Sequence, residues 1–321
     1  MVMTTPHPTA ATGVSAYPLD DEVVLYAPTD GQAYILNHTA ARVWNLPLGT
    51  RNEVALAQAI QVGRRFRARI VLVHVLRPET VRSSVGAGPA WMEWTSDQPP
   101  TDAELERAVD EMLADAAGAV RRAGLEAETI RRSGNVIDVL RELAEQVGVV
   151  LIGRQGIRGA ASLSGDQIGP DTRELIRRCP RPVLVSGRIP SPMDRVLVAY
   201  GGGPAGEGAL AFAARFAGII GAHLDVVHIG RSLDEGRDAL ARASGALSVT
   251  PLDFELHLLD GDVDTAVRDA IDRFQSNALF IGAHREDNGW LVPSLAGTIL
   301  RAADIPVLVH MEPATPGARV S

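Results

Sequence analysis

The sequence predicts an α/β fold of two tandem, doubly wound parallel-sheet domains that follow an N-terminal β-hairpin extension. Segment 54–75 returns as segment 208–229, an offset of 208 − 54 = 154 residues, which indicates a duplication. Continuous apolar runs alternate with amphipathic helical segments in both halves, as in parallel sheets covered by helices. Aromatic residues make up only 4% of a chain that is 46% hydrophobic, so aliphatic side chains must build the cores.

Further pairs of similar segments follow in the same order along the two halves. They are 134–138 with 261–265, 149–156 with 278–285, and 179–186 with 303–310. Order and spacing together indicate a duplicated domain, because shared propensity alone would reproduce neither. The expected organisation is a disordered segment 1–18, a hairpin with a short helix over 19–50, a first domain 51–187, a linker 188–194, a second domain 195–311 and a tail 312–321.

The extension is predicted to form a hairpin because two alternating apolar runs, 21–28 and 32–37, flank an Asp30-Gly31 turn. A short helix over 39–44 should follow. Segment 80–100 interrupts the first repeat only and is too long for an ordinary connection, which leaves a disordered insertion or a lid. Its two tryptophans, Trp91 and Trp94, favour packing on the surface of the domain over a ligand platform.

Each repeat then offers the same elements in the same order. A helix with one apolar stripe leads into a strand, 68–76 or 223–229, and a second helix opens with a capping box at Thr101 or Ser232. A strand, a helix, a buried strand, a glycine-bearing loop, a short helix and a last strand complete the unit. We expect the last strands, 182–186 and 306–310, to pair the two domains about a pseudo-twofold axis, because they would otherwise be exposed edges.

Composition excludes several classes of protein. The net charge is −8 and the 31 basic residues, all arginines, are interspersed with 39 acidic ones, so nucleic acid is not an expected partner. A single cysteine, Cys179, excludes an internal disulfide and a cysteine-based zinc site. Neither a signal sequence nor an apolar run of about 18 residues is present. We therefore expect a soluble cytoplasmic protein without a membrane partner.

The candidate ligand loops follow from topology, because the crevice of an open α/β sheet lies outside the carboxyl ends of its strands. Glycines there let backbone amides approach a phosphate, and the next helix adds a partial positive charge. Tight strand-to-helix turns would also need glycines. The candidate cofactor-binding residues are Gly153, Gly156, Gly159 and Gly169 in the first repeat, and Gly202, Gly282, Arg285, Gly297 and Thr298 in the second.

On these landmarks, chiefly the strands 72–76 and 225–229, the buried strands and the last strands, the chain resembles the universal stress protein family in its tandem form. The resemblance covers about residues 50–310. It implies a five-stranded, Rossmann-like parallel sheet in each domain, pairing through the last strands, and a role in stress response. In many members it also implies ATP held by a G-x2-G-x9-G-[ST] loop and an Asp after the first strand.

Both loops depart from that motif. In the first repeat twelve residues separate Gly156 from Gly169, and Pro170 stands in the place of the hydroxyl residue. Starting the motif at Gly156 and Gly159 restores the spacing of nine but still ends in Pro170. In the second repeat Arg285 replaces the second glycine, and the gap to Gly297 is eleven.

The acid after the first strand is also missing, since segment 47–50 contains none and Gly201 stands in its place in the second repeat. These departures predict degenerate nucleotide sites, with ATP the one cofactor left open and the first repeat the better site. No metal is predicted, because Asp260, Asp262 and Asp264 stand where carboxylates complement the dipole of the following helix. His74 and His228, which occupy equal positions in the repeats, are expected to be structural.

The N-terminal extension resembles a different family, the peptide chaperones named for the pyrroloquinoline-quinone biosynthesis D protein. The residues that carry this resemblance are Leu36, Asn37, Ala40, Val43 and Trp44. The same stretch is where the first strand of the first domain should lie. Either segment 41–48 is that strand, or the first sheet is built without its usual centre.

Three classes of function remain. The first is a non-catalytic stress-response or regulatory binding module with degenerate nucleotide sites. The second is an ATP-binding switch with slow hydrolysis, and the third is a peptide-binding accessory that adds a peptide strand to the hairpin. No motif for a catalytic triad, a metalloprotease or a Walker-type lysine loop is present, so we do not expect an enzyme. Protein partners and a homodimer are left open.

Overall fold

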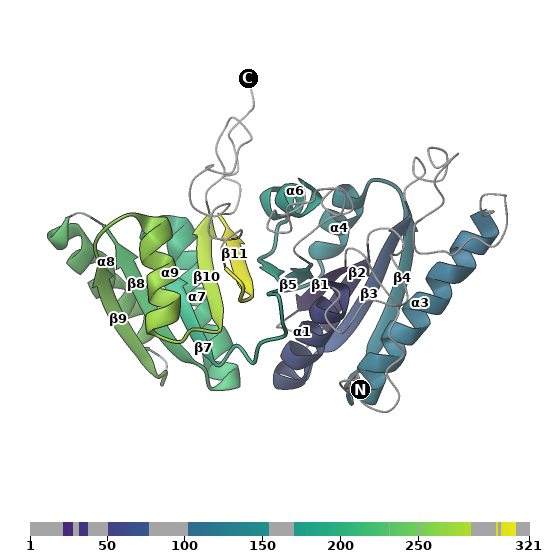
Figure 1. Cartoon of the computed structure of the whole chain (residues 1–321), viewed down its shortest axis with the longest axis horizontal. Coiled ribbons are helices and arrows are strands. Elements are labelled where there is room, and N and C mark those ends of the chain that lie inside the picture. Colours follow the sequence, from purple (N-terminus) through teal and green to yellow (C-terminus); the bar gives the residue numbers. More distant parts are fainter. Residues whose placement is uncertain are drawn as a thin grey trace, which may run out of the picture.

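The computed structural model describes residues 22–27, 32–37, 51–76, 102–153, 170–230, 232–249, 251–283, 300 and 303–312. The described strands form one sheet of eleven strands that runs through both halves of the chain, in the order β4-β3-β1-β2-β5-β6-β11-β10-β7-β8-β9 (Figure 1). The expected segments 1–18, 39–44 and 80–100 lie outside the described residues, as do Trp91 and Trp94. Among the described helices, none is long and apolar enough to cross a bilayer.

The second half is a parallel sheet of five strands in the order β11-β10-β7-β8-β9. Its strands are β7 (Arg195–Ala199), β8 (His223–Ile229), β9 (Phe254–Leu259), β10 (Ala278–Ala283) and β11 (Val307–Met311), and its helices are α7 (Gly203–Ile220), α8 (Leu233–Leu247) and α9 (Val263–Arg273). The predicted cap at Ser232 forms, since its hydroxyl accepts from the amide of Glu235 at the start of α8. Asp262, predicted only to complement the helix dipole, also caps α9 by accepting from the amide of Thr265. The parallel sheet with helices on both of its faces confirms the predicted doubly wound fold.

The first half repeats this plan with one difference at its centre. Its strands are β1 (Glu22–Ala27), β2 (Gln32–Asn37), β3 (Arg69–Leu76), β4 (Ala127–Ser133), β5 (Val149–Ile152) and β6 (Val183–Val185), and its helices are α1 (Arg51–Phe66), α3 (Asp102–Arg122), α4 (Val136–Ala144) and α6 (Pro170–Arg178). In the second half a single parallel strand, β7, lies between β8 and β10. In the first half the hairpin of β1 and β2 lies between the equivalent strands, β3 and β5.

The hairpin is therefore an integral part of the first sheet. Strand β2 runs parallel to β3, from Gln32 opposite Arg69 to Asn37 opposite His74. Strand β1 runs antiparallel to β5, from Val23 opposite Ile152 onward. Of the two alternatives, the described strands agree with a first sheet built without its usual centre, because a hairpin lies where the second half has the single strand β7. Segment 41–48, the other candidate, lies outside the described residues. The peptide-binding alternative is wrong in its mechanism, because both hairpin strands are already paired on both sides.

The two halves join through their last strands, which confirms the predicted pairing. Strands β6 and β11 are antiparallel, with Val183 opposite Val309, Leu184 opposite Leu308 and Val185 opposite Val307. Antiparallel pairing of equivalent strands makes the chain a pseudo-twofold dimer of its own repeats. Neither last strand is left as an unpaired edge.

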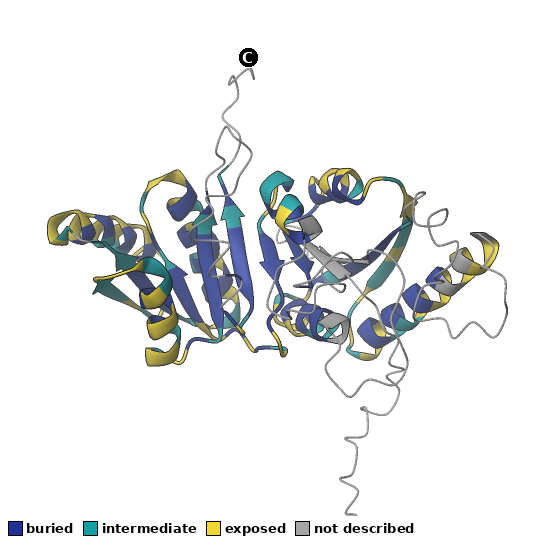
Figure 2. Cartoon of the chain, turned by 45° about the horizontal axis from the view of Figure 1, so that its top comes forward, coloured by how far each residue is buried: buried dark blue, intermediate teal, exposed yellow. Residues whose placement is uncertain are grey.

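Two hydrophobic cores lie on the two faces of the sheet, and each contains residues from both halves. Helices α1, α3, α7 and α8 cover one face, and helices α4, α6 and α9 cover the other. The inner strands β3, β5, β6 and β10 are buried along most of their length, whereas the edge strands β4 and β9 are only partly buried and the outer helix surfaces are exposed (Figure 2). Cys179 is buried in the second of these cores.

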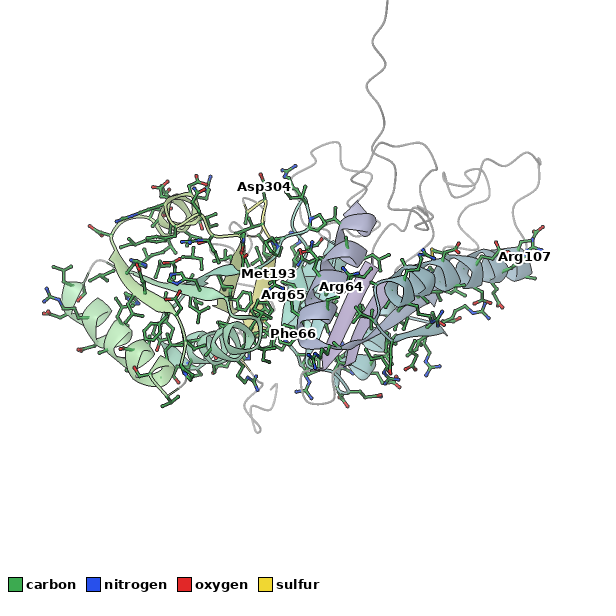
Figure 3. The ribbon with its side chains drawn as sticks, turned by 90° about the horizontal axis from the view of Figure 1, so that it is seen from below. Arg64, Arg65, Phe66, Arg107, Met193 and Asp304 are labelled. Atoms are coloured by element: carbon green, nitrogen blue, oxygen red, sulfur yellow. The ribbon has the colours of Figure 1, made fainter. Side chains whose placement is uncertain are left out.

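Contacts of α1 with the linker and with the second half reinforce the strand pairing. The side-chain amide of Gln58 donates to the carbonyl of Ser191 at 2.9 Å and accepts from its backbone amide at 2.7 Å. Phe66 packs against Phe216 with ring centroids 5.2 Å apart. Figure 3 shows Phe66 with Met193 where the two halves meet. The two domains are thus joined by a buried interface in addition to the linker.

Candidate functional site

The crevice of the second half lies at the carboxyl ends of β7 and β10, where the order of the strands reverses. Strand β7 ends at Ala199 and is followed by the buried Tyr200, then by three glycines, 201–203, that lead into α7. The backbone of Gly202 and Gly203 has positive φ angles of 75° and 70°, which glycine adopts without strain. This turn brings the chain directly from the central strand to the start of a long helix.

The start of α7 has the properties of an anion site. Gly202 is the N-cap residue and supplies no side-chain hydrogen bond, so no side chain caps the first amides of the helix. Among the described residues, a Cβ atom built on Gly201 or Gly203 would meet nothing within 4 Å, whereas one on Gly202 would lie 3.3 Å from a guanidinium nitrogen of Arg242 on α8. Backbone donors, the positive end of the helix dipole and an arginine therefore border one open space.

Gly282, near the end of β10, allows this strand to pack closely against α7. A Cβ atom there would overlap the carbonyl of Ala205 in the first turn of α7. The structure thus brings two predicted residues, Gly202 and Gly282, to the start of α7. The other predicted residues of this repeat, Arg285, Gly297 and Thr298, lie outside the described residues.

Two histidines of the second half have structural surroundings. Nδ1 of His228 lies 2.9 Å from the carbonyl oxygen of Tyr200 and so links β8 to the end of β7, which agrees with the predicted structural role. The ring of His310 on β11 packs directly against Gly208 of α7. Burial, with a smaller contribution from Arg215, lowers the pKa of His310. This histidine is therefore held in its neutral form beside α7.

In the first half, only one of the predicted glycines is located. Gly153 is buried at the carboxyl end of β5, and its carbonyl accepts a hydrogen bond of 3.4 Å from the hydroxyl of Thr172 on α6. This bond ties the start of α6 to the end of β5. Gly156, Gly159 and Gly169 lie outside the described residues.

Sequence reasoning missed Arg242. It lies on the exposed side of an amphipathic helix, where an arginine is ordinarily a solvated side chain, and only the packing of α8 beside α7 brings it to the glycine turn. A signal was present in the three consecutive glycines, which mark a place where the backbone must remain accessible.

The side chain of His74 differs from that of its counterpart His228, because neither of its ring nitrogens has a hydrogen-bond partner among the described residues. His74 is 0% exposed. Burial, with a smaller contribution from Arg131, lowers the pKa of His74 to about 3. The unfolded chain therefore takes up this proton first as the pH falls, so the folded state should lose stability between about pH 6.5 and pH 3.

Replacing His74 by Leu is expected to remove this dependence. The wild-type chain should lose up to about 1.4 kcal/mol of stability per pH unit from this residue below pH 6.5. At pH 8 the variant should be at least as stable, because an apolar side chain leaves no unpaired polar atom. Urea unfolding of both proteins at pH 8, 6 and 5 measures the difference. If the free energies of unfolding of the two proteins changed equally with pH, the burial of a neutral imidazole would be contradicted.

Comparisons with known proteins agree with this architecture. The sequence model described as "Universal stress protein family" matches residues 50–186 and 192–310. A curated universal stress protein from Synechocystis sp. is 26% identical over 206 residues, which is 61% of this chain and 70% of that protein. The family match begins at residue 50, so it lends no support to the peptide-chaperone resemblance of the N-terminal segment.

Solved structures share the fold over most of the chain. A universal stress protein from Archaeoglobus fulgidus superposes with a TM-score of 0.66 at 17% identity, covering 86% of this chain and 97% of that one. A putative universal stress protein from Pseudomonas aeruginosa superposes with a TM-score of 0.58 at 16% identity, covering 87% of this chain and 92% of that one. At this level of identity the likeness establishes the fold.

Proposed function

This chain belongs to the universal stress protein family, and on that premise we propose that it is a non-catalytic regulatory binding protein of the stress response. Its ligand is an adenine nucleotide, held in the crevice of the second half. ATP is the ligand that the family resemblance implies, and the crevice carries part of the features that such a ligand needs. The acid after the first strand and the full glycine motif are missing, which indicates a weak site that binds a nucleotide without hydrolysing it.

The single observation that carries this proposal is the open start of α7. Gly201 and Gly203 face open space, Gly202 leaves the first helical amides without a side-chain cap, and Arg242 lies beside the turn. Uncapped amides and a guanidinium are the donors that bind phosphate oxygens in proteins. The described geometry therefore supports a phosphate-bearing ligand in the second half, although the glycine spacing of the sequence favours the first.

The same turn explains why we propose binding without hydrolysis. Gly201 stands where the resemblance implies an acid, and the sequence Gly-Gly-Gly-Pro over 201–204 offers no general base. The nearby His228 is engaged with the carbonyl of Tyr200. Phosphoryl transfer depends on positioned bases and charges in addition to a phosphate cradle.

Titration of the full chain with ATP, by calorimetry, tests the site. We expect Gly201→Trp to abolish binding, because the indole would fill the open space without backbone strain at this position. Arg242→Ala should weaken binding by roughly 10- to 100-fold, the value of one hydrogen bond to a charged group. Gly245→Trp is the matched control, since that glycine is exposed on α8 and also faces open space. It should bind ATP as the wild-type chain does.

Two further variants separate the halves. Loss of binding in Gly156→Trp alone would place the nucleotide in the first half, as the sequence ranks it, and would overturn the assignment to α7. Loss in Gly297→Trp would support the second half. Release of inorganic phosphate by the wild-type chain at a rate above that of Gly201→Trp would show that the protein hydrolyses ATP, contrary to the proposal.

A further inference from the structure

A second polar cluster lies at the opposite, amino ends of the strands of the second half, beneath α9. Asp225 on β8 lies directly opposite Glu255 on β9, and His257 follows two residues later on the same face of β9. Leu197, Val227 and Val267 belong to the hydrophobic core on this face, while His223 and Arg195 lie beside Asp225 toward the amino ends of the strands. The ionisable side chains therefore converge at the border of a hydrophobic core.

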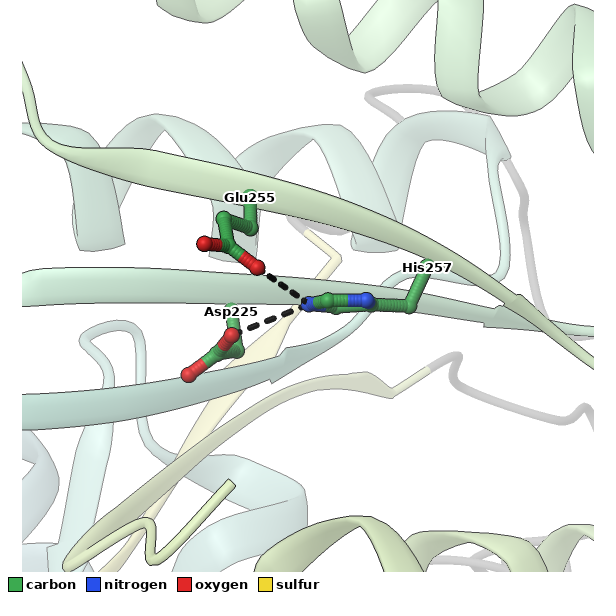
Figure 4. A group of neighbouring side chains, drawn as sticks. All are labelled: Asp225, Glu255 and His257. Carbon is green, nitrogen blue, oxygen red and sulfur yellow. Dashed lines mark hydrogen bonds and ion pairs between the residues drawn. The ribbon is translucent and has the colours of Figure 1, made fainter. Parts of the chain in front are cut away.

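The distances in this cluster match the coordination shell of a metal ion. Nε2 of His257 lies 3.0 Å from Oδ1 of Asp225 and 3.7 Å from Oε2 of Glu255 (Figure 4). One donor atom from each of the three residues lies within 4.8 Å of the others. Zinc bonds of about 2.0–2.2 Å place the ligand atoms of a tetrahedral site roughly 3.4 Å apart. The observed separations lie on both sides of that value.

Hydrogen bonding alone does not satisfy these groups. A single N–H on Nε2 of His257 faces two carboxylates and can serve only one of them well. Asp225 is 1% exposed, and its Oδ1 is the oxygen that lies toward His257 (Figure 4). Its Oδ2 points away from His257, accepts no hydrogen bond from the described residues and lies 4.0 Å from a guanidinium nitrogen of Arg195. The charge of this buried carboxylate is therefore only weakly compensated, and a cation bound at Oδ1 would compensate it.

Neighbouring residues hold the ligands in place. The imidazole of His257 stacks on the ring of Phe274 with centroids 4.1 Å apart, which fixes its plane. His223 lies on the other strand, with Nε2 3.5 Å from Oδ1 of Asp225 and Nδ1 2.8 Å from Oδ2 of Asp253. An imidazole held in a fixed plane is suited to ligate a metal ion, because its nitrogen lone pair then keeps one direction.

Charge also favours a divalent cation. Asp225, Glu255 and Asp253 bring three negative charges, against one positive charge on Arg195, so two negative charges remain when the histidines are neutral. The side chain of Glu255 is 66% exposed, which gives an ion a path from solvent. An imidazole nitrogen with carboxylates favours zinc over Mg²⁺ and Ca²⁺, which prefer all-oxygen ligands.

We propose that Asp225, Glu255 and His257 form a zinc site that clamps β8 to β9 at the end of the sheet opposite the nucleotide crevice. Three protein ligands leave a fourth position for water. The ion joins an inner strand of the second half to its edge strand, so its binding stabilises the second half. This site is independent of the nucleotide proposed above.

The test is zinc binding by the untagged full chain after dialysis against a chelator, because a polyhistidine tag would itself bind zinc. After zinc is added back and the excess removed, metal analysis should find one equivalent of zinc per chain, and the added zinc should raise the midpoint of thermal unfolding. Glu255→Gln should weaken zinc binding at least 10-fold and abolish the thermal shift. Because this side chain is largely exposed, the variant should fold normally, which the midpoint without metal confirms.

His257→Gln and Asp225→Asn should behave in the same way, and Asp238→Asn, an exposed carboxylate of α8, is the control that should bind zinc as the wild-type chain does. Absence of zinc binding by the wild-type chain would overturn the proposal. So would zinc binding that Glu255→Gln and His257→Gln leave unchanged. Tighter binding of Mg²⁺, Ca²⁺ or Mn²⁺ than of zinc would overturn the identity of the metal.

Discussion

A chain that begins at Arg51 is expected to lose the folded first half. The deletion removes β1 and β2, which lie between β3 and β5. Strand β3 would lose its pairing from Arg69 to His74, and β5 its pairing from Val149 to Ile152. Both are inner strands, with Ile70 and Val150 fully buried. The backbone groups left unpaired at the centre of a sheet should cost more than the 5–15 kcal/mol that stabilises a typical domain.

The measurement is thermal unfolding followed by circular dichroism, together with limited proteolysis of the two halves. The truncated chain should be poorly soluble, and protease should digest residues before the linker while sparing the second sheet. A chain that begins at Tyr17 is the control, because it retains both hairpin strands and should unfold as the full chain does. Equal midpoints for the Arg51 chain and the full chain would show that the hairpin is a separable module.

A charge at the junction of the two halves should have the second largest effect. Leu184 on β6 and Leu308 on β11 lie opposite each other, each 1% exposed, in the core that both halves share. Leu184→Asp buries a carboxylate at an apolar position, which should cost about 4 kcal/mol or more. Because the two halves share this core, we expect a single unfolding transition at a lower temperature.

Urea and thermal unfolding measure the change in stability. Val249→Asp is the control, because Val249 is 84% exposed and the substitution should change stability by no more than about 0.5 kcal/mol. If Leu184→Asp instead produced two separate transitions with unchanged midpoints, the two domains would be energetically independent. Such a result would contradict the continuous core.

The sequence by itself determined the duplication and the order of elements within each repeat. Consecutive apolar residues along β3 and β8 belong in turn to the two opposite cores, since successive strand residues point to opposite faces. The caps Ser232 and Asp262 and the paired last strands were also predictable, because helix starts and final apolar strands have local signatures. The glycines near Gly202 likewise marked the ligand crevice of an open sheet.

Only the tertiary structure decided which segment occupies the centre of the first sheet. The hairpin pattern predicted β1 and β2, but pairing with β3 and β5 joins segments distant in sequence, which local periodicity does not encode. The approach of Arg242 to the glycine turn depends in the same way on helix packing. Asp225 lies 30 residues before Glu255, and only the register of β8 against β9 puts their carboxylates side by side. Local pattern fixes which face of an element is apolar, whereas long-range register fixes which polar groups meet.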